Sequence, residues 1–130
     1  MIACASPHSR LSQRQRQGLA AEGLALAYLT ERGLTCLARN VRYRVGELDL
    51  VMRDGAVVVF VEVRSRRPSR FGTAASSVDG RKQRRLIRAA QCWISQFVRG
   101  GMPALRFDVV AIDGLDIQWI ANAFGLDAVL

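Results

Sequence analysis

Hydrophobic and polar positions follow two different periods along the chain, and these periods predict seven elements. In two segments apolar residues recur every three or four positions, which is typical of helices with one buried face. Five shorter segments are apolar, rich in β-branched residues and bounded by turn-forming residues, which predicts strands. The predicted helices cover residues 13–32 and 80–98, and the predicted strands cover residues 35–43, 47–53, 56–65, 105–112 and 116–120. This order, α-β-β-β-α-β-β, predicts an α/β domain with a mixed sheet.

Length and composition favour a single domain. The chain has 130 residues, half of them hydrophobic, which is enough to bury a substantial core. We expect residues 1–12 to form a disordered tail and residues 13–130 to form the domain. No apolar run approaches the ~20 residues that span a bilayer, and the start lacks the pattern of a signal peptide. The three cysteines, Cys4, Cys36 and Cys92, are widely spaced, which favours free thiols, so we expect a cytoplasmic protein without a membrane partner.

Carboxylates interrupt the two apolar strands of a predicted hairpin. Asp54-Gly55 suits a two-residue turn, and if both residues form the loop, paired residue numbers sum to 109. Asp49 and Glu62 then lie on one face as diagonal neighbours, roughly 7–8 Å apart between α-carbons. Like charges this close repel, and a hard divalent cation relieves the repulsion through oxygen ligation. Structural ion pairs with neighbouring arginines are the alternative. The same alternation places an apolar set on the opposite face: Leu48, Leu50, Met52, Val57, Val59, Val61 and Val63.

A basic block follows the hairpin. Residues 64–88 contain nine basic residues and one acidic residue, and this excess of eight equals the formal net charge of the whole chain, +8. Such a block favours a polyanionic partner, most commonly nucleic acid; a solvated basic face and an acidic protein partner are the alternatives. Cations in the first turns of the helix at 80–98 oppose the helix dipole, and bound phosphate would offset that cost.

Two helical polar residues are further candidates, and several mechanisms lack the residues they need. Glu22 lies within the apolar stripe of the first predicted helix. Gln83 lies one turn before two apolar residues, where its amide would face the same site; an ordinary surface position is the alternative.

The only histidine, His8, falls in the expected tail, so histidine-based catalysis or metal binding has no candidate. No glycine-rich phosphate loop is present. Of the mechanisms considered, metal-assisted chemistry at carboxylates is the one that still has candidate residues.

These residues resemble a known motif. Asp49 in GELDLV, followed by Glu62-Val63-Arg64, resembles the PD-(D/E)-X-K signature of restriction-endonuclease-like nucleases. More closely, the chain resembles the YraN family of predicted endonucleases, which is related to archaeal Holliday-junction resolvases. The matching segments extend in order over nearly the whole domain: residues 18–29, 39–40, 46–50, 60–66, 71–72, 82–90, 106–110 and 122–124.

The resemblance implies a restriction-endonuclease-like mixed sheet flanked by helices, with a Mg²⁺- or Mn²⁺-dependent site that cleaves DNA, including branched or repair DNA. Asp49 and Glu62 would be metal ligands, and the carbonyl of Val63 would complete the coordination. Glu22 would be an accessory acidic residue, and Gln83 would correspond to a helical glutamine of some superfamily branches. Related resolvases work as dimers, so the resemblance makes a homodimer one possibility, while the sequence itself does not settle dimerisation.

One position departs from the motif, because Arg64 stands where the superfamily has lysine. Arginine keeps the positive charge that stabilises a transferring phosphate, but it cannot deprotonate and its geometry differs. Two functions therefore remain open: a metal-dependent endonuclease, and a non-catalytic nucleic-acid-binding protein on a decayed nuclease scaffold. Lys82, the only lysine in the chain, is a candidate substitute from the second helix. The residues expected to grip the nucleic-acid backbone are Arg66, Arg67, Arg70, Arg81, Lys82, Arg84, Arg85 and Arg88.

Overall fold

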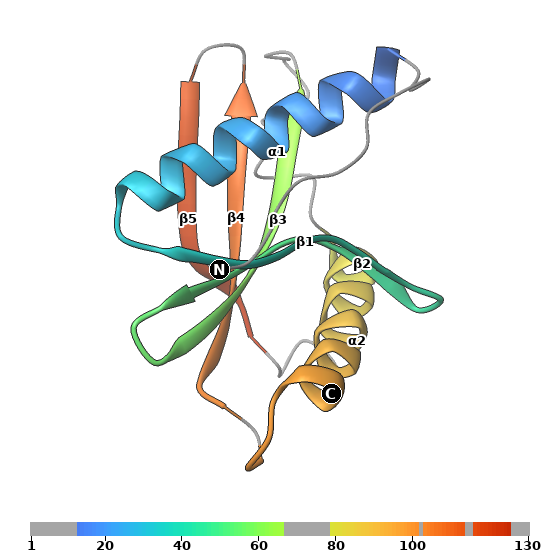
Figure 1. Cartoon of the computed structure of the whole chain (residues 1–130). Coiled ribbons are helices and arrows are strands. Elements are labelled where there is room, and N and C mark those ends of the chain that lie inside the picture. Colours follow the sequence, from blue (N-terminus) through green and yellow to red (C-terminus); the bar gives the residue numbers. More distant parts are fainter. Residues whose placement is uncertain (1–12, 67–78, 102, 114–115, 126–130) are drawn as a thin grey trace.

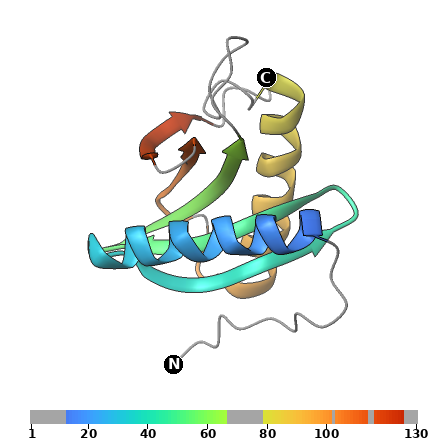
Figure 2. The ribbon, with the colours of Figure 1, turned by 90° about the horizontal axis from the view of Figure 1, so that it is seen from above.

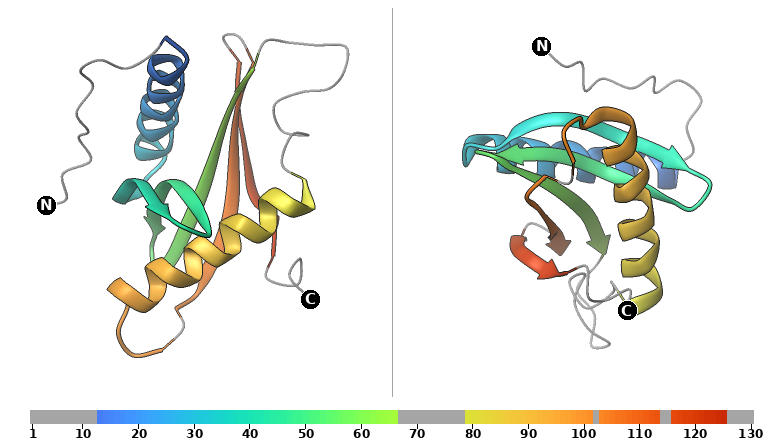
Figure 3. Two further views of the ribbon diagram at one scale, coloured as in Figure 1. Left: turned by 90° about the vertical axis from the view of Figure 1, so that its right-hand side faces the viewer. Right: turned by 90° about the horizontal axis from the view of Figure 1, so that it is seen from below.

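The computed structural model of the chain contains a five-stranded sheet with one helix on each face (Figure 1, Figure 3). The structure describes residues 13–66, 79–101, 103–113 and 116–125, so the expected tail at 1–12 lies outside the described residues. The element order confirms the predicted α-β-β-β-α-β-β arrangement. The elements are α1 (Gln13–Glu31), β1 (Thr35–Tyr43), β2 (Gly46–Asp54), β3 (Val57–Arg66), α2 (Gly80–Phe97), β4 (Leu105–Asp113) and β5 (Asp116–Phe124).

The sheet is mixed and its spatial order follows the chain, β1-β2-β3-β4-β5. Strands β3 and β4 pair in parallel, and the other three neighbouring pairs are antiparallel. A parallel pair needs a long crossover, and α2 lies within the one that joins β3 to β4. The last strand, β5, runs to Phe124 and is therefore longer than the predicted strand at 116–120.

Two apolar clusters, one on each face, hold the helices to the sheet. Helix α1 lies along one face of the sheet (Figure 2). There Ala25 and Leu29 pack with Leu50, Val61 and other buried residues of the central strands. On the other face, the buried residues of α2 include Ile87, Ala90 and Trp93, and they pack with Phe60 and Phe107 of the sheet. Because both faces of β3 are covered, its sequence is a nearly unbroken apolar run rather than an alternating one.

The register of the β2–β3 hairpin differs from the predicted one. Asp54 pairs with Val57 and Leu50 pairs with Val61, so paired numbers sum to 111 and the loop is Gly55-Ala56. The prediction of 109 is wrong because the positive φ of +60° falls on Gly55, the first loop residue, as in a type II′ turn. The shift is an even number of residues, so it leaves the alternation of faces along each strand unchanged.

Strands β2 and β3 separate where the predicted carboxylates lie. Their ladder ends at the pair Leu50↔Val61, while β2 stays paired with β1 as far as Gly46 and β3 stays paired with β4 as far as Arg66. We call this divergence, from Asp49 on β2 and Glu62 on β3 onward, the fork (Figure 1).

The fork also explains a wrong face assignment. Leu48 was predicted to share a face with Leu50, but it packs in the α2 cluster while Leu50 packs in the α1 cluster. Beyond the fork β2 is paired only with β1, so its side chains no longer follow the alternation of the central sheet.

The tip of the β1–β2 hairpin lies against α2. The Tyr43 hydroxyl donates a hydrogen bond to Gln96 Oε1 at 2.6 Å. A Cβ at Gly46 would lie 2.6 Å from the carbonyl oxygen of Arg85, closer than real Cβ contacts allow, so only glycine fits there. This contact fixes one wall of the cleft described below.

A buried charged network lies at the other end of the sheet. Asp108 is fully buried and accepts hydrogen bonds from Arg106 Nε at 3.0 and 3.2 Å, from Trp119 Nε1 at 2.9 Å and from the backbone N–H of Asn122 at 2.9 Å. Arg106 also donates to Asp54 beside the hairpin turn at 3.0 Å. The network therefore ties β5 and the β2–β3 turn to β4.

Two remaining expectations concern cysteines and membranes. Cys92 is a free thiol as expected, but Cys36 is disulfide-bonded, so the expectation of free thiols is wrong for Cys36. Among the described residues, no helix is both long enough and apolar enough to cross a membrane.

Candidate active site at the fork

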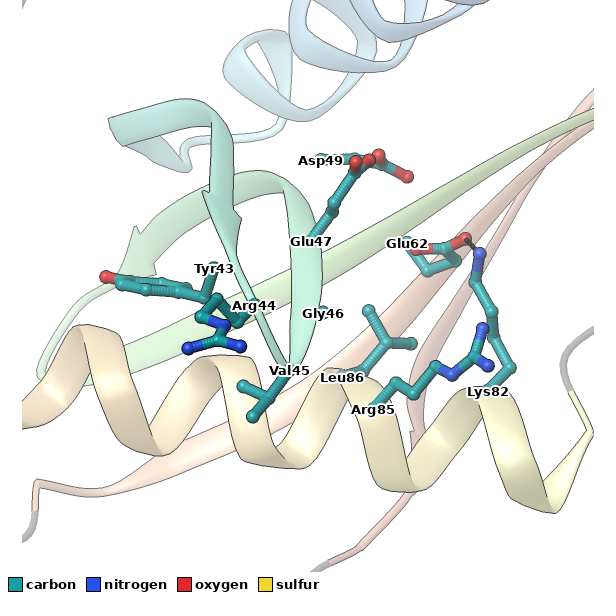
Figure 4. A pocket seen from close by; sticks show the side chains of 10 residues that line it. All are labelled: Tyr43, Arg44, Val45, Gly46, Glu47, Asp49, Glu62, Lys82, Arg85 and Leu86. Atoms are coloured by element: carbon teal, nitrogen blue, oxygen red, sulfur yellow. Dashed lines mark ion pairs between the residues drawn. The ribbon is translucent and has the colours of Figure 1, made fainter.

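A cleft of about 370 Å³ opens at the fork. Strands β2 and β3 contribute its carboxylates, α2 and the β1–β2 hairpin contribute its cations, and Lys82 of α2 is paired with Glu62 (Figure 4). The described residues that line it are Tyr43, Arg44, Val45, Gly46, Glu47, Asp49, Glu62, Lys82, Arg85 and Leu86. The cleft thus brings together Asp49, Glu62, Lys82 and Arg85, four residues that the sequence analysis singled out from three different segments.

Asp49 is oriented by the backbone of the neighbouring strand. Because β2 has left β3 at this point, the backbone of Val63 faces the Asp49 side chain rather than a paired strand. The Val63 N–H donates to Asp49 Oδ2 at 2.9 Å. This hydrogen bond holds the Asp49 carboxylate over β3, next to the position of Glu62.

Glu62 is a buried carboxylate with two cationic neighbours. Its side chain is 4% exposed, and its Oε1 lies 3.2 Å from Lys82 Nζ and 3.5 Å from Arg64 Nη1. Burial, and next the negative charge of Asp49, raise the pKa of Glu62 to about 8, although Lys82 and Arg64 act in the opposite direction. The cations therefore do not fully offset the cost of placing Glu62 beside Asp49.

Glu22 approaches the same aspartate from α1. It is 9% exposed, and burial followed by the charge of Asp49 raises its pKa to about 7, while Arg39 and Asn40 lower it. Its Oε2 atom is buried and makes no hydrogen bond among the described residues. Asp49 therefore acts on both Glu22 and Glu62, raising the pKa of each, and Glu22 keeps an unsatisfied carboxylate oxygen.

Asn40 is a site residue that the sequence analysis did not single out. It lies in β1 between the pairs Arg39↔Leu50 and Val41↔Leu48, and hence opposite Asp49. Its φ is +55°, a left-handed conformation that asparagine tolerates better than other non-glycine residues and that is uncommon inside a strand. An asparagine within an apolar strand pattern was the available signal, because asparagine is depleted in strands.

The remaining predicted residues lie around the cleft or outside the described part of the structure. Gln83 is half-buried on α2 and is not among the described residues that line the cleft. Arg66 ends β3, but its side chain is not described, and Arg67 and Arg70 lie outside the described residues. The other cations expected to grip nucleic acid are exposed along α2: Arg81, Arg84, Arg85 and Arg88.

The donor set at the fork suits a hard divalent cation. Among the described residues, no group of three or more histidine, cysteine, aspartate or glutamate side chains is arranged to hold a metal ion. Mg²⁺, however, commonly binds through one or two carboxylates and keeps several waters, and Asp49 and Glu62 supply two. The raised pKa of Glu62 reflects charge repulsion from Asp49 as well as burial, and a cation between the two carboxylates would relieve that repulsion.

Fold and site together define a mixed α/β protein whose cleft combines the buried Glu62 and the half-buried Asp49 with cations of α2 and of the β1–β2 hairpin. Residues 21–112 match the uncharacterised protein family UPF0102, and this chain belongs to that family. A UPF0102 protein of Ralstonia nicotianae is 55% identical over 115 residues, which cover 85% of this chain and 88% of that protein. A UPF0102 protein of Klebsiella pneumoniae is 49% identical over 120 residues, covering 90% and 93%. A third, of Pseudomonas putida, is 49% identical over 129 residues, covering 95% and 98%.

Proposed function

We propose that this chain is a divalent-metal-dependent endonuclease that hydrolyses phosphodiester bonds of DNA, including branched or repair DNA. The observation that supports this best is the meeting of Asp49 and Glu62 at the fork, in a cleft that is also lined by Arg44, Lys82 and Arg85. Carboxylates that hold a metal ion, beside cations that bind phosphate, are the two parts that phosphodiester hydrolysis requires. The proposal places the chain among PD-(D/E)-X-K nucleases.

Asp49 and Glu62 would hold Mg²⁺ or Mn²⁺, with the backbone carbonyl of Val63 and water as further ligands. A metal ion bound there lowers the pKa of a coordinated water and neutralises charge on the scissile phosphate. Asp49 is already aimed at this position by its hydrogen bond from the Val63 N–H. The unsatisfied Oε2 of Glu22 would accept a hydrogen bond from a metal-bound water or ligate a second ion.

The protein's own cations bind and orient the substrate. In the hydrolysis, the oxygen of water bonds to phosphorus and one P–O ester bond breaks. The attacking water loses its proton to solvent, and the leaving sugar oxygen gains one from solvent. Arg64 contacts Glu62 at 3.5 Å, and its charge would hold that carboxylate in place beside the substrate. Exposed arginines of α2 would hold the flanking phosphates, which makes binding weaken with salt.

A cleavage assay tests the proposal. Double-stranded, single-stranded and branched DNA would be incubated with the purified protein and Mg²⁺ or Mn²⁺. Asp49→Asn and Glu62→Gln are expected to abolish cleavage. Glu47→Gln, which changes an exposed carboxylate that lines the same cleft, is the matched control and is expected to cleave as the wild type does. Cleavage that survives both substitutions at the fork would refute this mechanism.

A non-catalytic nucleic-acid-binding protein is the second candidate, and one observation favours it. Lys82 and Arg64 both contact the same oxygen of Glu62, which is what a purely structural role for these carboxylates would require. This function predicts salt-sensitive binding of DNA without cleavage in either metal, and no cleavage after Arg64→Lys. We further propose that the chain acts as a homodimer, which sedimentation analysis with and without DNA would test.

A further inference from the structure

Lys82 is the only lysine among the 19 lysine and arginine residues of the chain. It lies in the first turn of α2, where Asp79 Oδ1 accepts a hydrogen bond from its backbone N–H at 3.0 Å. This cap fixes the backbone of Lys82 at the start of the helix. Its side chain reaches β3, and Nζ lies 3.2 Å from Oε1 of Glu62 (Figure 4). The crossover between β3 and β4 thus brings the single lysine to the buried carboxylate of the fork.

Two cations approach Glu62, but they have different access to the cleft. Arg64, which occupies the sequence position of the motif lysine, contacts the same oxygen at 3.5 Å. Lys82 lines the cleft, whereas Arg64 is not among the described residues that do. Any substrate in the cleft would therefore meet the Lys82 ammonium beside Glu62.

On the basis of the proposed nuclease function, we propose that Lys82 is a catalytic residue of this site and that Arg64 is a positioning residue that holds Glu62. The Lys82 ammonium donates hydrogen bonds to a non-bridging oxygen of the scissile phosphate and stabilises the charge that develops there. A lysine on α2 thereby supplies the cation that the PD-(D/E)-X-K motif places two residues after its glutamate. Arginine is not equivalent at this position, because its planar guanidinium is bulkier and presents its donors in a fixed fork, unlike the compact ammonium.

Lys82→Arg is the informative substitution, because it retains the charge and the ion pair with Glu62. We expect the single-turnover cleavage rate at saturating protein to fall about 100- to 1,000-fold, the loss typical when one transition-state donor is removed. The Kd for DNA is expected to change less than about threefold, since one phosphate contact of several is altered. Arg85→Ala removes another cation that lines the same cleft, and there the expected effect is a several-fold rise in Kd. Thermal unfolding of each variant would confirm that it is folded.

A rate for Lys82→Arg within about threefold of the wild-type rate would overturn the assignment. Equal losses of affinity in Lys82→Arg and Arg85→Ala, with no loss of rate at saturation, would do the same. If the wild type cleaves and Lys82→Arg cleaves equally well, the role of Lys82 fails while the nuclease function stands. If the wild type cleaves no DNA with either metal, the nuclease function fails and the role of Lys82 fails with it.

A second readout does not depend on cleavage. Reductive methylation with ¹³C-formaldehyde keeps the charge of lysine and labels only Lys82 and the α-amino group, and Lys82→Arg identifies which NMR signal is which. We expect Mn²⁺ to broaden the Lys82 signal in the wild type, because the ion binds next to Glu62, and to leave it sharp in Asp49→Asn. Mn²⁺ binding shown by calorimetry without broadening of this signal would place the ion away from Lys82 and overturn the proposal.

Discussion

The buried carboxylates of the fork predict an unusual dependence of stability on pH. The folded protein holds Glu62 with a pKa of about 8, against an ordinary value of 4.5. Between these two values the folded state retains a proton that the unfolded state has released. The free energy of unfolding therefore falls as pH rises through this window. This stabilisation is complete below the pKa that Glu62 has in the unfolded chain. It is lost as the pH rises through the pKa that Glu62 has in the folded protein.

The magnitude follows from the shift. At about 1.4 kcal/mol per pKa unit, the rise from 4.5 to about 8 corresponds to on the order of 5 kcal/mol over the whole window. Between pH 5 and pH 8 the expected loss is roughly 3 kcal/mol, or roughly 10 °C in Tm for a domain of this size. The pKa of Glu22, raised to about 7, acts in the same direction. Because both glutamates face Asp49 and share its repulsion, their contributions are not simply added.

Urea unfolding at constant ionic strength with EDTA, at pH 5, 6, 7 and 8, would measure this dependence. Glu62→Gln is expected to flatten the profile, because the neutral amide cannot release a proton. Glu47→Gln, which alters an exposed carboxylate of the same cleft, is expected to keep the wild-type slope. A free energy of unfolding that stays constant or rises between pH 5 and pH 8 would refute the reasoning. Adding Mg²⁺ at pH 8 is expected to restore part of the lost stability in the wild type and not in Glu62→Gln.

Three further predictions concern other parts of the fold. Gly46→Ala is expected to lower stability by about 1–3 kcal/mol, because its Cβ would lie 2.6 Å from the Arg85 carbonyl oxygen; Gly23→Ala in α1, where the Cβ meets nothing within 4 Å, should instead raise Tm. Asp108→Asn is expected to cost about 1–3 kcal/mol in urea unfolding, since the amide NH₂ of asparagine cannot accept from the donors that converge on this fully buried side chain. Asn40→Gly keeps the left-handed backbone but removes the amide beside Glu22, so we expect unchanged Tm within about 3 °C and weaker Mn²⁺ binding by calorimetry. A large loss of Tm without a change in Mn²⁺ affinity would assign Asn40 to folding alone.

The sequence predicts the fold well because its signals are local. Apolar periodicity and turn residues define each helix and strand on their own, and the observed bounds of α1 and α2 differ from the predicted ones by a single residue at most. The register of the β2–β3 hairpin was missed because Asp54-Gly55 and Gly55-Ala56 are both acceptable two-residue loops. Only the conformation of Gly55 distinguishes them. A register shift of two residues, in contrast, leaves the alternation of side chains between the two faces unchanged. The prediction that Asp49 and Glu62 share a face therefore did not depend on which residues form the loop.

The candidate site could be predicted only in part, because it depends on where two strands separate. Alternation along β2 and β3 indicates which residues share a face, but it does not mark Leu50↔Val61 as the last pair of the ladder. Without that end point, the sequence does not show that the Val63 N–H is available to Asp49, so their hydrogen bond could not be predicted. For Asn40, an asparagine inside a strand pattern was the only signal, and it does not indicate that the residue has a positive φ or lies opposite Asp49.

Under the proposed nuclease function, the fork gives a physical reason why the motif lysine could come from another element of the fold. The carboxylate of Glu62 is buried at the point where β2 separates from β3, and the packing of the β1–β2 hairpin tip against α2 fixes the helix beside it. A cation can therefore reach Glu62 either along β3, as Arg64 does, or across from α2, as Lys82 does. Only the second route ends in the cleft among the described residues. If the proposed nuclease function holds, an arginine at position 64 does not imply a lost activity, because Lys82 of α2 would supply the lysine that meets the substrate.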